Sequence, residues 1–412
     1  MRPQIFARYR PGRLARNGTI LLGWMLLRAS MQAATVVWLA RQLGAQTYGQ
    51  FVAVVAVSSF FSPFVGLGLS HILLRNAARD PAHAGHYLAR ALRWWLRTLL
   101  PCVAASVVVA LWLLPERIAL QALIVVAAAE LSATSLTELC ARHLQAQQRT
   151  HAFGAVHAGL PGVRLAAVGL LWASMGDAGI VAVLWTYAAS GLIYAGLLWR
   201  PLRAAAKAPD AVLPEPMTAR SGLPFSLAVF AAKLQSEFNK PMLAQAGFGL
   251  AGTYNVAQRV VDMASLPVLA LQEALWPRLY AQANPVRQLL RTGAALLVLA
   301  LAMGVALWLV APVLPVMFGA DFADAVAVLR MLAWLPLLQV LRALLNCHAI
   351  HYGRMQQIGW AYAIGGVVSV VSVAVLAPVY GLTGAVWASY AAEVTMVVFF
   401  LLSVLRKYQY SG

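Results

Sequence analysis

The sequence predicts an all-α polytopic membrane protein, with about twelve transmembrane helices in two six-helix lobes around a central cavity. Its composition is 61% hydrophobic and 11% charged, with a mean hydropathy of +0.73, whereas soluble domains carry about 25% charged residues. Apolar runs recur along almost the whole chain, and each is long enough to cross a hydrocarbon core of about 30 Å as a helix. Helices are expected because lipid cannot satisfy exposed backbone groups.

Six apolar runs make up the first half of the chain. The first follows five arginines and resembles a signal peptide, but it is too long for the apolar region of one and shows no small-residue cleavage site. We therefore expect an uncleaved first helix. The six expected helices are 18–39, 48–74, 94–114, 118–140, 153–175 and 178–199.

The longest polar stretch, residues 200–222, contains four prolines and four basic residues and predicts a linker. Six more apolar runs follow it, at 223–246, 253–276, 291–314, 323–346, 357–378 and 381–404. The expected domains are thus an N-terminal six-helix lobe (1–199), a cytoplasmic linker (200–222) and a C-terminal six-helix lobe (223–412).

The distribution of basic residues predicts the orientation in the membrane. The chain has 31 Lys and Arg against 13 Asp and Glu, for a formal net charge of +18. Of these cations, 22 lie on one side of the membrane, in the segments that connect the expected helices or at the helix ends beside them. The other side has only Arg41 and Arg117. Cytoplasmic loops are rich in Lys and Arg, so we expect a bacterial inner-membrane protein with both termini in the cytoplasm. The basic loops predict anionic membrane lipids as partners, and no motif indicates nucleic acid.

An internal repeat relates the two halves. The segment Leu43–Gly49 (LGAQTYG) follows the first expected helix, and Gly249–Asn255 (GLAGTYN) follows the seventh. The offset is 206 residues, the separation of Thr47 from Thr253. With six helices in each half, the repeats are parallel and their axis runs along the membrane normal.

Charged side chains within the expected helices are the candidate functional residues, because each is costly in lipid and needs a partner, water or a function. Arg28 lies in the first helix with Gln32 one turn away, and helix seven carries Lys233, Glu237 and Lys240 on one face. Arg259 and Asp262 follow in helix eight, and Glu130, Arg164 and Glu393 lie in helices four, five and twelve.

These charges allow two interpretations. In the first, Arg28, Lys233, Lys240 and Arg259 line a cavity that binds a phosphate-rich group, with Gln32 beside them. In the second, the charges pair internally, as Glu237 with a lysine or Arg259 with Asp262. We expect the cavity for helices one and seven, and an internal pair for Arg164 and Glu130. Glu237 and Glu393 are the candidate sites of ion coupling.

Motifs for cofactors, metals or catalysis are not expected. The three cysteines are scattered through apolar runs, and two HxxH pairs (His83 with His86, His348 with His351) lack further ligands for a metal site. A GxGxxG match at residues 247–252 lies in a turn between two membrane helices with no strand before it. We expect a protein that is not an enzyme, without cofactor or metal.

The opening of the chain resembles the polysaccharide flippases of the Wzx type. The resemblance comes from Asn17, from Arg28 and Gln32, and from the segments ARQLGAQTYG (40–49), GLG (66–68) and GTYN (252–255). That family is related to multidrug (MATE) exporters and lipid II flippases. The resemblance implies transport of an undecaprenyl-diphosphate-linked oligosaccharide to the periplasmic leaflet for O-antigen, capsule or exopolysaccharide assembly, with a polysaccharide polymerase and a chain-length regulator as partner proteins. It also implies a cationic central cavity.

The alternative function is a multidrug or metabolite exporter of the same superfamily, for which an acidic cavity would be expected. A membrane glycan polymerase or transferase is a third possibility, disfavoured by the short outer loops.

Overall fold

The structure is a computed structural model that describes residues 11–115, 118–176, 179–207, 215, 217–269, 271–272, 285–351 and 354–410. Within these ranges it is almost entirely helical and contains no strand. Eight of the described helices are long and apolar enough to cross a membrane. The predicted all-α membrane architecture is confirmed.

The N-terminal half begins with α1 (Pro11–Phe60), which covers the first predicted helix and the start of the second. Gly44 bends α1, because its φ of 68° and ψ of 173° are not helical. The other helices of this half are α2 (Leu69–Arg79), α3 (Ala84–Leu113), α4 (Leu120–Ala146), α5 (Thr150–Met175) and α6 (Ile180–Ala205).

The C-terminal half begins with α7 and ends with the long helix α15, which bends at Gly381 (φ 56°, ψ −128°) and covers the last two predicted helices. Its helices are α7 (Ala219–Glu237), α8 (Asn239–Ala246), α9 (Phe248–Ala264), α11 (Pro285–Val310), α12 (Leu314–Phe318), α13 (Ala325–Leu332), α14 (Leu335–His351) and α15 (Met355–Tyr410). The end of the predicted helix 253–276 lies outside the described residues.

Two predicted helices are divided, and proline explains both divisions. Proline lacks an N–H and its ring clashes with the carbonyl four residues earlier. Pro241 lies four residues after Glu237, where α7 ends, and Pro336 lies four residues after Leu332, where α13 ends. The predicted linker 200–222 was too long, since α6 continues to Ala205 and α7 begins at Ala219.

The predicted helix 48–74 was also wrong in its middle. The chain leaves the helix after Phe60 and resumes it at Leu69. Between them, Gly66, Leu67 and Gly68 all have positive φ values of 80°, 49° and 65°. Glycine adopts this region freely, but Leu67 is strained there, and such strain persists only where the surroundings hold it in place. The backbone N–H of Gly66 donates to the Thr98 hydroxyl at 2.7 Å.

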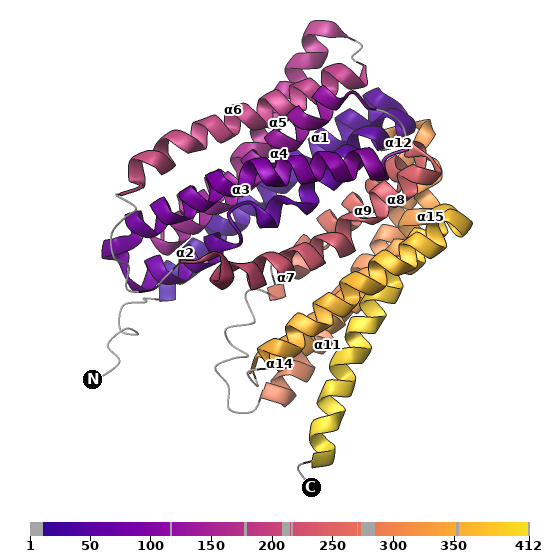
Figure 1. The fold of residues 1–412 in the computed structure, drawn as a ribbon. Coiled ribbons are helices and arrows are strands. Elements are labelled where there is room, and N and C mark those ends of the chain that lie inside the picture. Colours follow the sequence, from indigo (N-terminus) through magenta and orange to yellow (C-terminus); the bar gives the residue numbers. More distant parts are fainter. Residues whose placement is uncertain are drawn as a thin grey trace.

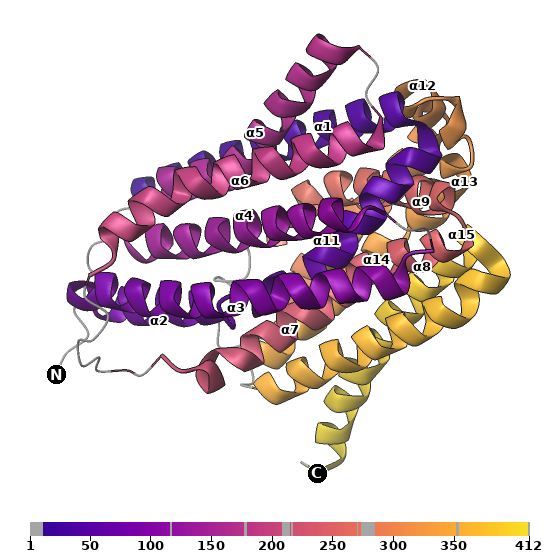
Figure 2. The ribbon, with the colours of Figure 1, turned by 45° about the horizontal axis from the view of Figure 1, so that its top comes forward.

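The two halves form a V. In Figure 1 and Figure 2 the helices of the N-terminal half (indigo to pink) and those of the C-terminal half (rose to yellow) meet at one end and spread apart toward the other. The spread end is where α1 begins and α15 ends, and we call it the inner end. The opposite end is called the outer end. The positive-inside pattern predicts that the inner end faces the cytoplasm.

The two repeat segments pack directly against each other at the outer end. A Cβ atom on Gly49 would overlap the backbone oxygen of Phe248, and one on Gly252 would overlap that of Ala45. The backbones of α1 and α9 therefore approach each other as closely as glycine allows. The side-chain oxygen of Gln46 also accepts a 2.8 Å hydrogen bond from the backbone N–H of Gly249. The outer end is closed by contacts between the halves.

A second line of contacts joins α7 to the N-terminal half along one flank of the V. The Ser226 hydroxyl donates to the backbone oxygen of Pro63 at 2.7 Å. Phe64 packs against Phe230, with ring centroids 5.1 Å apart. Closer to the inner end, His71 stacks on the ring of Phe225 with centroids 5.5 Å apart. This flank of the V is closed along much of its length.

Candidate functional site

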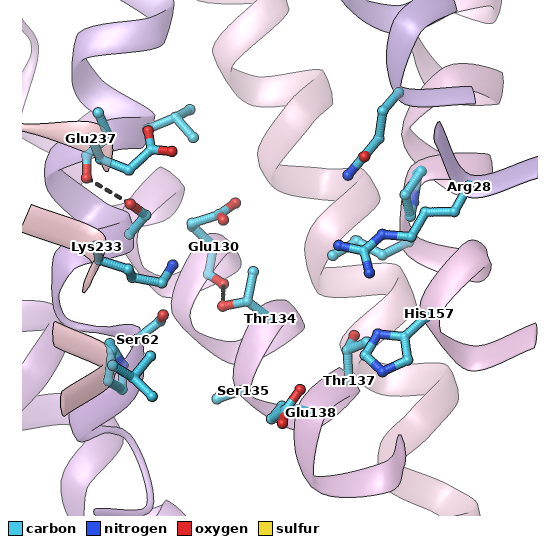
Figure 3. A pocket seen from close by; sticks show the side chains of 18 of the residues that line it. Arg28, Ser62, Glu130, Thr134, Ser135, Thr137, Glu138, His157, Lys233 and Glu237 are labelled. Carbon is cyan, nitrogen blue, oxygen red and sulfur yellow. Dashed lines mark hydrogen bonds between the residues drawn. The ribbon is translucent and has the colours of Figure 1, made fainter. Parts of the chain in front are cut away.

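A cavity of about 800 Å³ lies between the two halves. Its walls come from α1, α2, α4 and α5 on one side and from α7, α8 and α9 on the other. Figure 3 shows charged side chains of both halves pointing into it, with Lys233 and Glu237 on one wall and Arg28 and His157 on the opposite wall. A deep cavity between helix bundles is a common position for a binding site.

The described lining is rich in charge and net positive. Each half contributes three cations and two carboxylates, so each wall carries a net charge of +1 and the cavity +2. The cations are Arg28, Arg142, Arg164, Lys233, Lys240 and Arg259, and the acids are Glu130, Glu138, Glu237 and Asp262. The structure thus brings together all the predicted binding residues, Arg28, Gln32, Lys233, Lys240 and Arg259, along one cavity.

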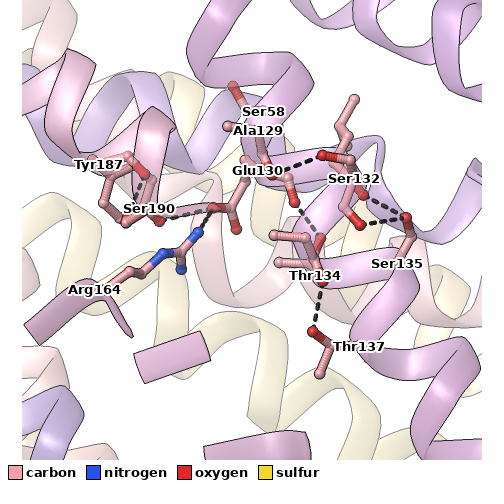
Figure 4. A network of polar contacts seen from close by, with 12 residues as sticks. Ser58, Ala129, Glu130, Ser132, Thr134, Ser135, Thr137, Arg164, Tyr187 and Ser190 are labelled. Atoms are coloured by element: carbon pink, nitrogen blue, oxygen red, sulfur yellow. Dashed lines mark hydrogen bonds and ion pairs between the residues drawn. The ribbon is translucent and has the colours of Figure 1, made fainter. Parts of the chain in front are cut away.

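In the N-terminal wall, Glu130 and Arg164 form a buried ion pair, as predicted. An Arg164 guanidinium nitrogen donates to the Glu130 carboxylate at 2.5 Å, and the Tyr187 hydroxyl donates to the same oxygen at 2.8 Å. The guanidinium also lies 4.0 Å from the centre of the Tyr187 ring. Figure 4 shows this network extending along α4 through Thr134. Both charges are compensated, so the pair holds α4, α5 and α6 together.

In the C-terminal wall, the charges gather around Glu237. The Lys240 ammonium pairs with one carboxylate oxygen, and Arg259 approaches the other at 4.0 Å. Only 2% of the Lys240 side chain is exposed, so it supports the wall rather than reaching into the cavity. The pair between Arg259 and Asp262, part of the alternative interpretation, is not formed, and Asp262 has no cation within 4.0 Å among the described residues.

Two cations of the lining have no carboxylate within 4.0 Å in the described part of the chain: Arg28 on α1 and Lys233 on α7. Arg28 is exposed to the cavity and Lys233 is half-buried. Figure 3 shows the two head groups directed toward the same space from opposite walls. They are available to bind an anion placed between the halves, because no carboxylate of the described residues pairs with them.

Three lining residues near the inner end were not predicted from the sequence: Glu138, Arg142 and His157. An Arg142 guanidinium nitrogen donates to one oxygen of Glu138 at 2.6 Å. Their spacing of four residues is the signal that predicts such a pair. It was overlooked because the predicted helix ended at residue 140, whereas α4 continues to Ala146.

Glu393, the second candidate for ion coupling, lies away from this cavity. Its carboxylate accepts hydrogen bonds from Arg342 at 2.7 Å and from Gln235 at 3.0 Å, and only 3% of its side chain is exposed. Arg342 also donates to the Tyr362 hydroxyl at 2.7 Å. Coupling of an ion at Glu237 or Glu393 would require the present partner cation to move away.

The described residues contain no group of His, Cys, Asp and Glu side chains arranged to hold a metal ion. The three cysteines are all buried and form no disulfide. The cavity offers two opposed cations, surrounding charges that are paired except for Asp262 among the described residues, and a polar N-terminal wall. This arrangement suits the binding of an anionic group with polar substituents.

Comparison with known proteins gives both a family and a fold. The family model described as "Polysaccharide biosynthesis protein" matches residues 14–283. No curated protein sequence matches the chain. Among solved structures, the lipid II flippase MurJ in an inward closed conformation aligns with a TM-score of 0.72 at 12% identity, covering 94% of this chain and 87% of MurJ.

Multidrug transporters share the fold as well. An inward-facing MATE family transporter of the MOP superfamily aligns with a TM-score of 0.68 at 15% identity, covering 94% of this chain and 98% of the transporter. An outward-facing one gives 0.62 at 14% identity, covering 95% and 94%. At these identities the likeness concerns the fold alone.

Proposed function

The chain belongs to the family of polysaccharide biosynthesis proteins, and from this premise we propose that it is a flippase for lipid-linked oligosaccharides. Its substrate would be an undecaprenyl-diphosphate-linked repeat unit, carried from the cytoplasmic to the periplasmic leaflet of a bacterial inner membrane. The product would serve O-antigen, capsule or exopolysaccharide assembly. A polymerase and a chain-length regulator would be its partners.

The opposed pair of Arg28 and Lys233 is the observation that carries this proposal. The two head groups face the same space and lack carboxylate partners among the described residues. A diphosphate in a lipid-linked sugar carries about two negative charges, which would balance the net charge of the cavity lining. Arginine additionally offers a planar fork of donors that matches phosphate oxygens.

Charge compensation also suggests how binding would drive closure. In the empty cavity, Arg28 and Lys233 lie on opposite walls and repel each other across the opening of the V. A diphosphate between them replaces this repulsion with attraction on both sides. The inner ends can then approach, while the contacts at Gly49 and Gly252 part to open the outer end. This exchange is alternating access around a fixed site.

Membrane potential would favour the outward direction. Moving one charge through the full field changes the free energy by about 2.3 kcal/mol per 100 mV. Outward movement of a diphosphate with two negative charges from a negative interior therefore lowers its free energy by about 5 kcal/mol per 100 mV. No coupled ion is needed for a directional bias.

Accumulation of the substrate inside cells tests the proposal. Cells carrying Arg28→Ala or Lys233→Ala, at normal protein abundance, are expected to accumulate undecaprenyl-diphosphate-linked repeat units and to lose surface glycan. Mass spectrometry of extracted lipids measures the first effect. Normal levels of both lipid and glycan in these variants would contradict the proposal.

An exporter of organic cations is the second candidate function. Asp262 favours it, because this carboxylate faces the cavity without a cation within 4.0 Å among the described residues. The net positive lining disfavours it, since a cationic substrate would be repelled overall. Sensitivity of cells to toxic cations after Asp262→Asn, with normal surface glycan, would support this alternative.

A further inference from the structure

We propose that the N-terminal wall of the cavity is a carbohydrate-binding surface that holds the sugars next to the diphosphate. This inference rests on the proposed flippase function and adds a division of roles to it. The diphosphate would lie between Arg28 and Lys233, while the sugar hydroxyl and amide groups would bind only to residues of the N-terminal half.

Unused hydrogen-bonding groups on this wall support the inference. In the described structure, five of its polar side chains besides Arg28 make no hydrogen bond, although each carries donors or acceptors. One oxygen of the Glu138 carboxylate is also without a partner, since Arg142 bonds only to the other. The five side chains are Gln32, Ser62, Ser70, His71 and His157.

The opposite wall shows the reverse pattern. Its uncharged polar side chains are Ser226 and Asn255, and both are already bonded to the N-terminal half. The Ser226 hydroxyl donates to the Pro63 backbone at 2.7 Å, and the Asn255 amide donates to Tyr48 at 2.7 Å. Its other polar side chains are charged. The capacity to bind neutral polar groups is therefore concentrated on one side of the cavity.

These groups also lie at a common depth. His71, Glu138 and His157 each lie seven or eight residues from the inner end of their helices, α2, α4 and α5. At 1.5 Å per residue, this places them about 12 Å inside the helix ends. Figure 3 shows Glu138, Thr137 and His157 gathered on one part of the wall, apart from Lys233. Sugars bound there would extend from the diphosphate toward the inner opening.

The chemistry of these side chains suits a neutral or amide-bearing sugar. A hydroxyl group donates and accepts at once, as a neutral imidazole ring does through its two nitrogens. The Glu138 oxygen accepts from sugar hydroxyls, and Gln32 both donates to and accepts from an acetamido group. The His71 and Phe225 rings, stacked at the edge of the cavity, add an apolar surface.

Binding to lipids with and without a sugar tests the inference. The purified protein in nanodiscs is titrated, with native mass spectrometry as the readout, with undecaprenol, undecaprenyl diphosphate and undecaprenyl-diphosphate N-acetylglucosamine. We expect the wild type to bind the glycosylated lipid at least about fivefold more tightly than undecaprenyl diphosphate, which corresponds to one net hydrogen bond. His157→Leu should lower this preference about fivefold, without changing the affinity for undecaprenyl diphosphate.

Two further variants separate the roles of the walls. Lys233→Ala should weaken binding of both diphosphates by the same factor. His83→Leu removes a histidine that lies outside the cavity lining and should change neither affinity. If His157→Leu fails to fold, as shown by its thermal unfolding, Ser70→Ala replaces it in the same comparison, with the same loss of preference expected.

The outcomes distinguish this inference from the function on which it rests. A wild type that binds undecaprenyl diphosphate no better than undecaprenol would overturn the flippase proposal itself. The carbohydrate surface alone would be overturned if the protein binds undecaprenyl diphosphate but shows no preference for the glycosylated lipid. The same holds if that preference survives in the variants of the N-terminal wall.

Discussion

The side-chain amide of Asn255 donates a 2.7 Å hydrogen bond to the hydroxyl of Tyr48, across the boundary between the two halves. Both side chains are buried at the outer end, with 3% and 1% of their surface exposed. The two residues belong to the repeat segments that also bring Gly49 and Gly252 together. The repeat thus forms the closure of the cavity on the outer side, and this bond must break when that side opens.

Gly252→Ala should weaken the outer closure, because its new Cβ would overlap the Ala45 backbone oxygen, which cannot move away as a flexible side chain can. Overpacking of this kind costs about 1–3 kcal/mol, here against the closed outer end. A cysteine in place of Gln46 should then react faster with a membrane-impermeant thiol reagent applied from outside. Gly196→Ala, with no atom within 4 Å of its Cβ, is the matched control. Equal labelling in both variants would show that the contact does not hold the outer end closed.

Arg28→Ala and Lys233→Ala should each reduce transport by at least about tenfold, since a hydrogen bond to a charged group contributes about 1.5–3 kcal/mol. Arg28→Lys should retain part of the activity, because the charge remains but the planar fork is lost. Initial rates of surface glycan appearance measure the effect. Arg200→Ala, a cation outside the cavity lining, is the control and should behave as the wild type. The assignment of Arg28 and Lys233 to substrate binding would be refuted if Arg200→Ala lost activity while Arg28→Ala and Lys233→Ala kept the wild-type rate.

The ion pair of Glu130 and Arg164 should be important for stability. Removing one partner leaves an uncompensated buried charge, which costs about 3–5 kcal/mol. Glu130→Gln and Arg164→Gln should therefore each lower the thermal unfolding temperature of the purified protein. The double variant should lose less than the sum of the two, because neither charge remains. Additive losses would mean that the two residues act independently.

Glu393→Gln tests whether the carboxylate of the C-terminal half has a structural or an ion-coupling role. The Glu393 carboxylate is buried and bonded to Arg342 and Gln235. Removal of its charge should therefore lower the free energy of unfolding by about 3–5 kcal/mol. Thermal unfolding should register this loss, while the dependence of transport on external pH and on sodium should match that of the wild type. A changed ion dependence with unaltered stability would instead assign Glu393 to coupling.

Much of this fold was predictable from the sequence because hydrophobic length dominates a membrane protein. Apart from residues 61–68, the predicted segments fall largely on helices where the structure describes them, and the charges on the first helices of each half line one cavity. Breaks were harder to predict. Proline accounts for the ends of α7 and α13, but the helix break at Gly66, Leu67 and Gly68 depends on contacts with Thr98 and α7, which are distant in the sequence.

The partners of individual charges were the least predictable feature. Arg164 with Glu130 was predicted from their matching depth on neighbouring helices. By contrast, the partner of Glu393, which is Arg342, depends on how helices pack around it. So does the absence of a cation near Asp262 among the described residues. Spacing along one helix does not determine such contacts. The same limit applies to His71 and His157, which line one cavity only once α2 and α5 are packed in the folded protein.

Translocation by the purified protein in liposomes tests the central proposal most directly. Undecaprenyl-diphosphate N-acetylglucosamine is placed in both leaflets, and its appearance at the outer surface is measured by an impermeant galactosyltransferase that adds a labelled galactose. We predict fast exchange between leaflets with the wild type and a rate near that of protein-free liposomes with the double variant of Arg28→Ala and Lys233→Ala. Exchange at the same rate with the double variant as with the wild type would contradict the opposed-cation site, and no exchange with the folded wild type would contradict the flippase function.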